Sequence, residues 1–500
     1  MLKDRHWQQA ISVLAAIVIV LPAWADNPAT SGNDETIARL EAQLAAQQQC
    51  LDEFKERLVA ATSQDEDAAR VEVMKQQIRE VLSEQEFRES LMPSMMQAGY
   101  DNGFYIKSSD DKFSMKINGF MQFRWTHYAT SSSNRYLAPG LQRDDRTGFD
   151  VQRLRLQFAG NAWGEDLTYH LTMRGEAADG YDFVLHYAWL NYRFCDEFQV
   201  TAGDFQLAST RSALLADQYG LQFVDRGVYD AVFGLGTGVG VRFWGQLFDK
   251  KLEYFLDIVN SLNGDRNRTI TNDPAELDSN PAILARLVWH AMGDDLGTWS
   301  IEGDMPKHDT PHLDIGFSYA FNDNQGDLRT TSIPFPMPRR FRTGGFGLTS
   351  TNGLQINQFS FDAAFKYMGF SAIGEYALRL VDPRRAGRQP FTPWWLATGQ
   401  GDTTTMHGAY VQVGYLLPIP GLEDKLEAVA RVGGISTLAN GQEGTWEYGA
   451  GLNYYIEGND VKLQADVVKV SEAPISSNYS SLANVNDDVL VFRVQLQVAF

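Results

Sequence analysis

The sequence predicts an all-β protein, a transmembrane barrel of 16 antiparallel strands with an N-terminal α-helical coiled-coil segment before it. Three observations indicate this class. Segments of alternating apolar and polar residues recur from residue 113 to the C-terminus, short turns alternate with long polar connections, and the chain ends in an aromatic residue, Phe500. A strand that crosses a bilayer needs only about 9–11 residues, and it alternates because one face meets lipid and the other meets water.

The last strand of the sequence, residues 489–500, shows the alternation most clearly. One face is apolar from Leu490 to Phe500, whereas the opposite face carries polar residues such as Arg493. Neighbouring side chains of a strand point to opposite faces. We therefore expect this strand to close the barrel by pairing with the first strand, at residues 113–128.

The composition agrees with such a barrel. The mean hydropathy of −0.29 is that of an ordinary water-soluble chain, as expected when lipid-facing and water-facing residues alternate. Aromatic residues make up 12% of the chain, which suits strands and the aromatic girdles at membrane surfaces. The formal net charge of −20 disfavours nucleic acid as a partner.

The first 25 residues have the pattern of a signal peptide. Lys3 and Arg5 precede an apolar core at residues 10–21, and the small-residue site Ala23-Trp24-Ala25 follows. The core is shorter than the roughly 20 residues that a membrane-spanning helix needs. We expect cleavage after Ala25 and a polar linker over residues 26–34.

Residues 35–92 predict a helix in the periplasm. Ile37, Leu40, Leu44, Gln47 and Leu51 begin a seam with alternating spacings of three and four residues, which is typical of a coiled coil between protomers, with Gln47 as a polar core position. An amphipathic helix that lies against the barrel is the alternative, and a contact with peptidoglycan or an envelope protein also stays open. A second linker, residues 93–112, leads to the barrel domain, residues 113–500.

The number of strands depends on one connection. If residues 293–311 form a single extended periplasmic connection, the count is sixteen, whereas a strand at residues 299–305 would raise it to eighteen. We expect sixteen. Either barrel is wide enough to enclose an aqueous channel.

No local pattern indicates catalysis, a metal or a cofactor. The run GLGTGVG at residues 234–240 lacks the last glycine of a dinucleotide-binding loop at the required position. His308 and His312 lie in a Pro-containing connection without a third ligand. Cys50 and Cys195 form no CxxC arrangement, and either free thiols or a disulfide would suit the periplasm. We expect no enzyme activity and no cofactor, although a hydrolase whose residues converge from distant strands stays open.

Several stretches, in their order and spacing, resemble the phosphate-selective porin O and P family. They are GYDNGFYIKSSDDKFSMKINGFMQFRW (residues 99–125), GFDVQRLRLQFAGNAW (148–163), VTAGDFQLASTRSAL (200–214), LNYYIEGNDVKLQADVV (452–468) and DDVLVFRVQLQVAF (487–500). The resemblance implies a homotrimeric porin with inward-folded loops, in which basic residues guide phosphate or polyphosphate in the best-known members. It also implies that the terminal Phe500 is presented to the barrel assembly machinery.

The candidate pore-lining and constriction residues are basic. Arg211 and Arg226 lie in the long third loop, and the family's paired basic residues are only partly kept, because Gln152 takes one of the two places beside Arg153. Acidic residues share the same faces, so we expect a lumen with both signs of charge. The wall candidates, from the alternation of their strands, are Arg124, Arg153, Arg155, Arg174 and Arg242.

These expectations together describe a water-filled channel in the outer membrane for passive diffusion of ions and small solutes, with phosphate or other anions among the candidates. The barrel would lie in the lipid of the cell outer membrane and the helix in the periplasm. The alternative is a structural or adhesive envelope protein, in which the coiled coil tethers the outer membrane and conduction is incidental.

Overall fold

A computed structural model describes residues 96–130, 145–176, 180, 182–215, 218–260, 262, 281–293, 301–324, 354–382, 404–422, 424–437, 444–471 and 488–500. Residues 1–95 lie outside these ranges. They include the predicted signal peptide, the first linker, the predicted coiled coil and Cys50. None of the helices within the described ranges is long and apolar enough to cross a lipid bilayer.

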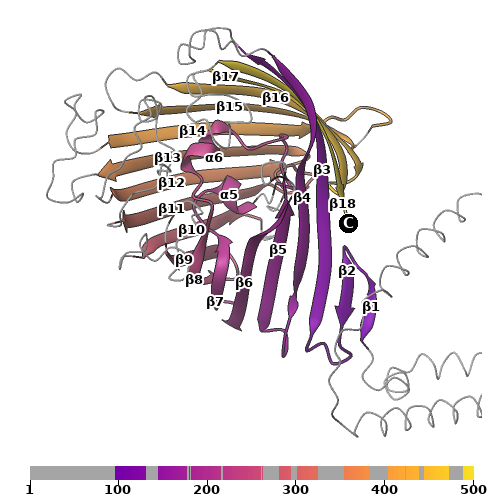
Figure 1. Cartoon of the computed structure of the whole chain (residues 1–500), viewed down its shortest axis with the longest axis vertical. Coiled ribbons are helices and arrows are strands. Elements are labelled where there is room, and N and C mark those ends of the chain that lie inside the picture. Colours follow the sequence, from indigo (N-terminus) through magenta and orange to yellow (C-terminus); the bar gives the residue numbers. More distant parts are fainter. Residues whose placement is uncertain are drawn as a thin grey trace, which may run out of the picture. The chain divides into compact units, whose positions relative to one another are not determined.

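Sixteen antiparallel strands follow one another around a curved sheet (Figure 1). They are β3 (Ser114–Thr130), β4 (Arg146–Asn161), β5 (Leu167–Gly175), β6 (Phe183–Cys195), β7 (Phe198–Gln206), β8 (Thr237–Leu247), β9 (Leu252–Val259), β10 (Ala282–Met292), β11 (His312–Asn324), β12 (Leu354–Tyr367), β13 (Phe370–Asp382), β14 (Thr404–Leu416), β15 (Leu426–Thr437), β16 (Thr445–Glu457), β17 (Val461–Ser471) and β18 (Val489–Ala499).

The sheet closes because β18 pairs with β3. Gln495 lies opposite Arg124, and Leu496 lies opposite Phe123. Each of the other neighbours along the chain, from β3 to β18, also pairs antiparallel. The connection between β10 and β11 contributes no strand in its described part, residues 301–311. The predicted sixteen-stranded barrel is therefore confirmed.

The faces of the barrel have the polarity that a membrane requires. On β18, Phe492 and Val494 are 40% and 39% exposed on the outside, whereas Arg493 and Gln495 on the inside are each 1% exposed. Lipid rather than water would cover the outer apolar side chains. The alternation found in the sequence is therefore an alternation between the outer surface and the lumen.

A short hairpin precedes the barrel strands. It consists of β1 (Gln97–Tyr100) and β2 (Phe104–Lys107), and β2 pairs with the start of β3, where Phe104 lies opposite Ile117. The C-terminal strand pairs with the rest of β3, since Gly119 and Phe500 exchange two backbone hydrogen bonds of 3.0 and 2.9 Å.

We expect Gly119→Ala to lower the yield of folded barrel. An added Cβ would lie 2.7 Å from both the carbonyl oxygen of Arg155 and the ring of Phe500. Overpacking of this kind costs about 1–3 kcal/mol. The measurement is the fraction of protein that migrates as the compact form on an unheated gel. Gly148→Ala is the control, because nothing lies within 4 Å of that position; equal folded fractions for the two variants would contradict the prediction.

Candidate channel constriction

The connection between β7 and β8, residues 207–236, enters the barrel and is here called the internal loop. It contains α5 (Arg211–Leu215) and α6 (Val228–Phe233), which lie on the inner side of the sheet (Figure 1). The backbone amides of Val224 and Val228 donate to the lumen-facing carboxylates of Asp466 and Glu447, at 3.1 and 2.6 Å. The loop therefore follows the inner wall and narrows the lumen.

Arg211 fixes the first part of the loop to an acidic part of the wall. Its guanidinium group donates to Asp362 on β12 at 2.7 Å and to Asp314 on β11 at 3.4 Å. Its backbone amide and that of Ser212 donate to Glu375 on β13, at 3.0 and 2.8 Å. A planar guanidinium group suits such a site because it presents several donors in a fixed fork.

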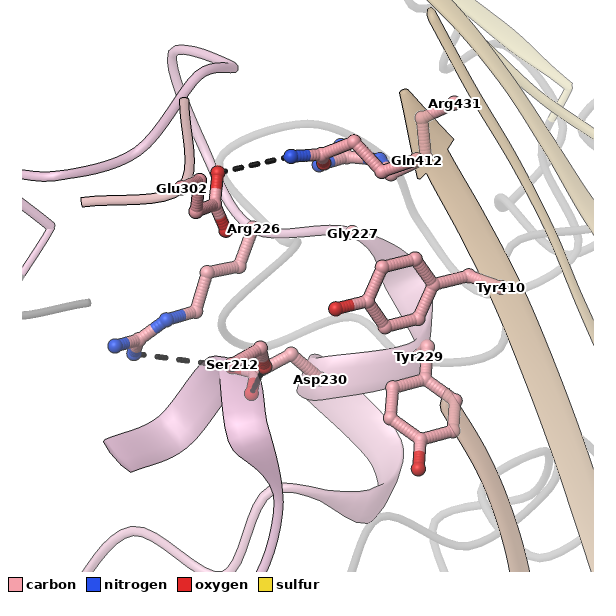
Figure 2. A pocket seen from close by; sticks show the side chains of 9 residues that line it. All are labelled: Ser212, Arg226, Gly227, Tyr229, Asp230, Glu302, Tyr410, Gln412 and Arg431. Atoms are coloured by element: carbon pink, nitrogen blue, oxygen red, sulfur yellow. Dashed lines mark hydrogen bonds and ion pairs between the residues drawn. The ribbon is translucent and has the colours of Figure 1, made fainter. Parts of the chain in front are cut away.

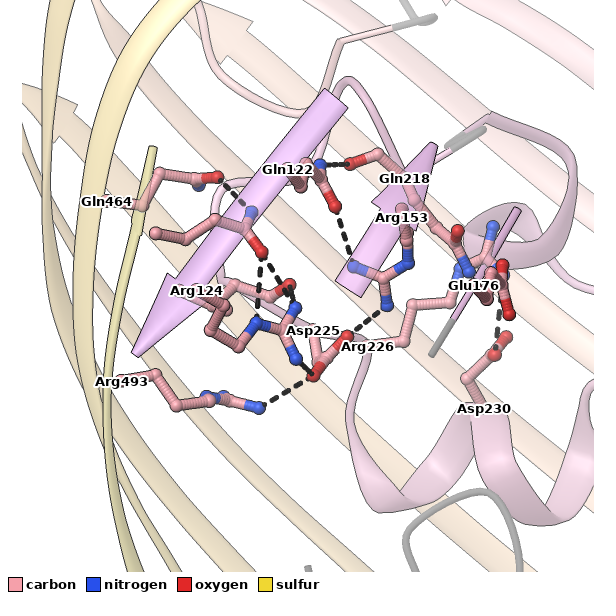
Figure 3. Close-up of polar contacts among 12 residues, drawn as sticks. Gln122, Arg124, Arg153, Glu176, Gln218, Asp225, Arg226, Asp230, Gln464 and Arg493 are labelled. Carbon is pink, nitrogen blue, oxygen red and sulfur yellow. Dashed lines mark hydrogen bonds and ion pairs between the residues drawn. The ribbon is translucent and has the colours of Figure 1, made fainter. Parts of the chain in front are cut away.

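Asp225 fixes a later part of the loop to a basic part of the wall (Figure 3). Its carboxylate accepts hydrogen bonds from Arg124 at 2.7 Å, from Arg493 at 3.0 Å and from Arg153. Arg493 also pairs with Asp466 at 2.7 Å. The two fixation points have opposite polarity, since a basic loop residue meets acidic strands and an acidic loop residue meets basic strands.

The basic wall keeps Asp225 ionised. Burial on its own raises the pKa of this carboxyl group, but the charges of Arg124, Arg153 and Arg493 outweigh burial and hold the pKa below its usual range. The carboxylate therefore keeps its charge across the pH range in which a bacterium lives.

Apolar packing holds α6 against the wall between the two charged clusters. Gly408 on β14 leaves room for this contact, because a Cβ there would lie 2.6 Å from the Phe233 ring. The helix residues form one buried cluster with the wall. Its members from α6 are Val228, Tyr229, Val232 and Phe233, and those from β14 and β15 include Met406, Tyr410, Val429 and Ile435.

A second segment also turns into the barrel, from the connection between β10 and β11. Glu302 accepts a hydrogen bond from the amide of Gln222 at 2.8 Å and donates its own amide to the carbonyl of Gly220 at 3.0 Å. Lys462 on β17 binds the same part of the loop, because its ammonium group donates to the carbonyls of Tyr219 and Leu221, each at 2.9 Å. Two inward segments therefore meet and occupy part of the lumen.

A small cleft of about 10 Å³ remains beside α6, enough for about one water molecule (Figure 2). Arg226 and Asp230 border it and form an ion pair of 3.9 Å with side chains 21% and 17% exposed. The side chain of Arg211 is only 3% exposed. Among the loop charges, water therefore reaches Arg226 and Asp230, and also the carboxylate of Asp225, which is 18% exposed.

Comparison with known families assigns the first part of the barrel. Residues 128–269 match the family model of the phosphate-selective porin O and P family. This porin segment runs from the end of β3 to beyond β9 and includes the internal loop with both of its fixation points. The family resemblance expected from the sequence is therefore confirmed for this segment. No curated protein matches the sequence.

Several solved structures match this chain at low sequence identity. The anion-selective porin from Comamonas acidovorans is 11% identical, with a TM-score of 0.48 over 78% of this chain and 100% of that one. The outer membrane channel DcaP of Acinetobacter baumannii is 10% identical, with a TM-score of 0.47 over 80% and 100%. Salmonella typhi OmpF, in complex with daunomycin, is 12% identical, with a TM-score of 0.46 over 80% and 100%. The strand pairing itself establishes the closed barrel.

The structure places the remaining predicted arginines of the porin segment on the lumen side. Arg155 pairs with Glu176, which follows β5, and Arg242 pairs with Asp257 on β9 at 2.6 Å. Arg174 lies opposite Arg155 in the register of β4 and β5. The seven candidates therefore do not form one ring, because Arg211 lies among acidic strands whereas Arg124 and Arg153 surround Asp225.

Sequence reasoning placed acidic residues such as Asp314, Asp362 and Asp466 on the lumen faces, but it did not identify the groups that they bind. Asp225 was visible only as one acidic residue near Arg226, and Glu302 lies in a connection whose path the sequence does not indicate. The available signal was the mixture of signs on inward faces, which predicts ion pairs but not their partners. The partners are far apart in sequence, as with Asp225 and Arg493.

Proposed function

We propose that this protein is an outer-membrane porin, a water-filled channel for passive diffusion of ions and small solutes. The observation that supports this most directly is the combination of a closed sixteen-stranded barrel, apolar outside and polar inside, with a loop fixed across its lumen. A barrel of this size encloses a channel rather than a side-chain-filled core. The porin family matched by residues 128–269 is a family of channels rather than enzymes.

The candidate arginines divide among three roles in this proposal. Arg124, Arg153 and Arg211 position the internal loop, because each is engaged by a carboxylate and largely buried. Arg226, together with Asp230, meets the passing solute. The wall residues Arg155, Arg174 and Arg242 add charge along the lumen, two of them beside carboxylates.

This division argues for weak rather than strong anion selectivity. An arginine that a carboxylate neutralises attracts a passing phosphate much less than a free one. The basic cluster around Asp225 also contains Asp466, so three guanidinium groups share two carboxylates. Phosphate is therefore one of several solutes that we propose for this channel.

The oligomer and the N-terminal segment belong to the same proposal. The family resemblance supports a homotrimer in the outer membrane, with residues 35–92 in the periplasm as a helical or coiled-coil segment. Envelope attachment through that segment would add to conduction rather than replace it.

Planar lipid bilayers test the proposal. Purified full-length protein should add stepwise conductance increments in KCl, and deletion of residues 36–90 should leave the size of the increments unchanged. Protein that is folded by its mobility on an unheated gel yet adds no conductance would contradict the porin function. A loss of envelope integrity in cells that carry the same deletion would favour the alternative function, a structural protein that tethers the outer membrane through its coiled coil.

A further inference from the structure

Aromatic side chains line the lumen side of β5, β6, β8 and β9. They are His170, Tyr187, Trp189, Trp244 and Phe255, here called the aromatic strip. Their lumen orientation follows from the alternation, since Trp244 shares a face with Arg242, which pairs with Asp257, and Trp189 shares one with the buried Asn191.

The rings of the strip stack on one another. The His170 ring lies 5.2 Å from that of Trp189 with an angle of 8°, and 5.6 Å from that of Tyr187 with an angle of 28°. The Trp244 and Phe255 rings lie 6.2 Å apart at 9°. The two groups are joined through Asn191, whose side-chain oxygen accepts a hydrogen bond of 3.0 Å from the Trp244 indole. Within each group the rings are therefore close to parallel, and the Arg242 guanidinium group lies over the Phe255 ring, 5.4 Å from its centre.

The strip lies where the wall is more open. Lumen-facing side chains of β10 to β18 are nearly fully buried, for example Arg379 at 0%, Gln412 at 2% and Gln464 at 1%. All five members of the strip are only half-buried. Trp189 and Phe255 pack on one side against the buried apolar cluster that contains Phe205 and Leu207, and the part of the strip that faces the aqueous lumen is apolar surface that a ligand would cover.

Polar side chains flank the rings. Gln246 and Glu253 lie next to Trp244 and Phe255 along β8 and β9, with a hydrogen bond of 3.1 Å between them. Beyond Tyr187, Arg174 and Glu176 lie towards the other end of β5, and both are half-buried. A ligand on the strip would thus find flat apolar faces under it and hydrogen-bonding groups around its edge.

We propose that the aromatic strip is a binding site for carbohydrates that pass through the channel. A pyranose ring has apolar C–H faces, which suit the negative face of an aromatic ring, and hydroxyl groups around its edge, which suit polar neighbours. A planar aromatic solute would use the rings but not the polar flanks. The inference rests on the proposed porin function and adds a class of solute to it.

Block of ion current by maltotriose tests the site. Added to wild-type channels in a planar bilayer, maltotriose should reduce the KCl current in a saturable way. Trp189→Ala should weaken its apparent affinity roughly tenfold, because the contact between the sugar ring and the indole ring is lost. Trp189→Phe keeps a ring and should stay close to wild type. Trp289→Ala, which removes a tryptophan that is 54% exposed on the outer face, should not change the block.

The outcomes separate this inference from the porin function. Wild-type channels that conduct but are not blocked by maltotriose, or are blocked equally after Trp189→Ala, would overturn the carbohydrate site and leave the porin. Block by a planar aromatic solute such as nicotinamide but not by maltotriose would overturn the assignment to carbohydrates. Absence of any channel in folded wild-type protein would overturn both. Faster swelling of proteoliposomes in glucose than in the open-chain polyol sorbitol, lost in Trp189→Ala, would support it independently.

Discussion

Asp225→Asn should raise the permeability of chloride relative to potassium roughly three- to fivefold, because a unit charge at about 4–6 Å in water-like surroundings is worth about 1 kcal/mol. Asn keeps the shape of the side chain but leaves Arg124, Arg153 and Arg493 without the carboxylate that they share. The loss of one partner from a buried ion pair costs about 3–5 kcal/mol, so the internal loop should also leave the wall. Reversal potentials in a KCl gradient measure the ratio, and single-channel conductance reports on the loop.

Asp230→Asn is the matched control for this variant. It removes the same charge from the same loop, but Asp230 pairs with Arg226 only at 3.9 Å, and the hydrogen bond of 2.5 Å that it accepts from the Ser212 hydroxyl group can also be accepted by the Asn side-chain oxygen. We expect a shift towards anions without a rise in conductance. Identical conductance in Asp225→Asn and Asp230→Asn would show that Asp225 does not hold the loop.

Arg211→Gln should shift selectivity in the opposite direction, towards cations, by a similar factor of roughly three to five. The substitution removes the guanidinium group that lies between Asp314 and Asp362 and leaves Arg286 as the remaining arginine on Asp362, at 2.7 Å. The acidic strands then carry excess negative charge towards the lumen. The measurement is again the reversal potential, together with the temperature at which the barrel loses its compact form on a gel, which should fall.

Arg211→Lys separates charge from geometry. Lys keeps the positive charge but lacks the planar fork, so the selectivity should return to that of wild type while the thermal stability recovers only in part. A selectivity of Arg211→Gln that equals wild type would contradict the role assigned to this residue.

The barrel could be predicted from the sequence because a strand records its two environments residue by residue. On the last strand, apolar Val494 and Leu496 alternate with polar Arg493 and Gln495. This alternation alone predicts which face meets lipid, without information about the tertiary structure. Strict alternation is interrupted at one point in β4, on the N-terminal side of Arg153. Arg153 lies opposite Gln122 and Val151 lies opposite Phe123, so Gln152 is an extra residue in a bulge, which strict alternation cannot foresee.

The constriction could be predicted only in part. The loop was recognisable from its length and its arginines, but its path depends on pairings between residues that are distant in the chain, such as Asp225 with Arg493 on the last strand. The residues of a loop do not alternate as those of a strand do, so the sequence does not indicate which strands of the wall a loop carboxylate will contact. The charge pattern therefore predicted ion pairs in the lumen, and only the fold decided that some of them hold the loop in place.

The hairpin before the barrel limits how the ring of strands can close. Both β2 and β18 use the same edge of β3, with β2 paired up to Ile117 and the chain end paired at Gly119. If β18 slid by one residue, every lipid-facing side chain on it would turn towards water. Because β2 already occupies the next positions on β3, the last strand has no free edge along which to slide further in that direction. The hairpin thus acts as a stop that sets the register of the final seam.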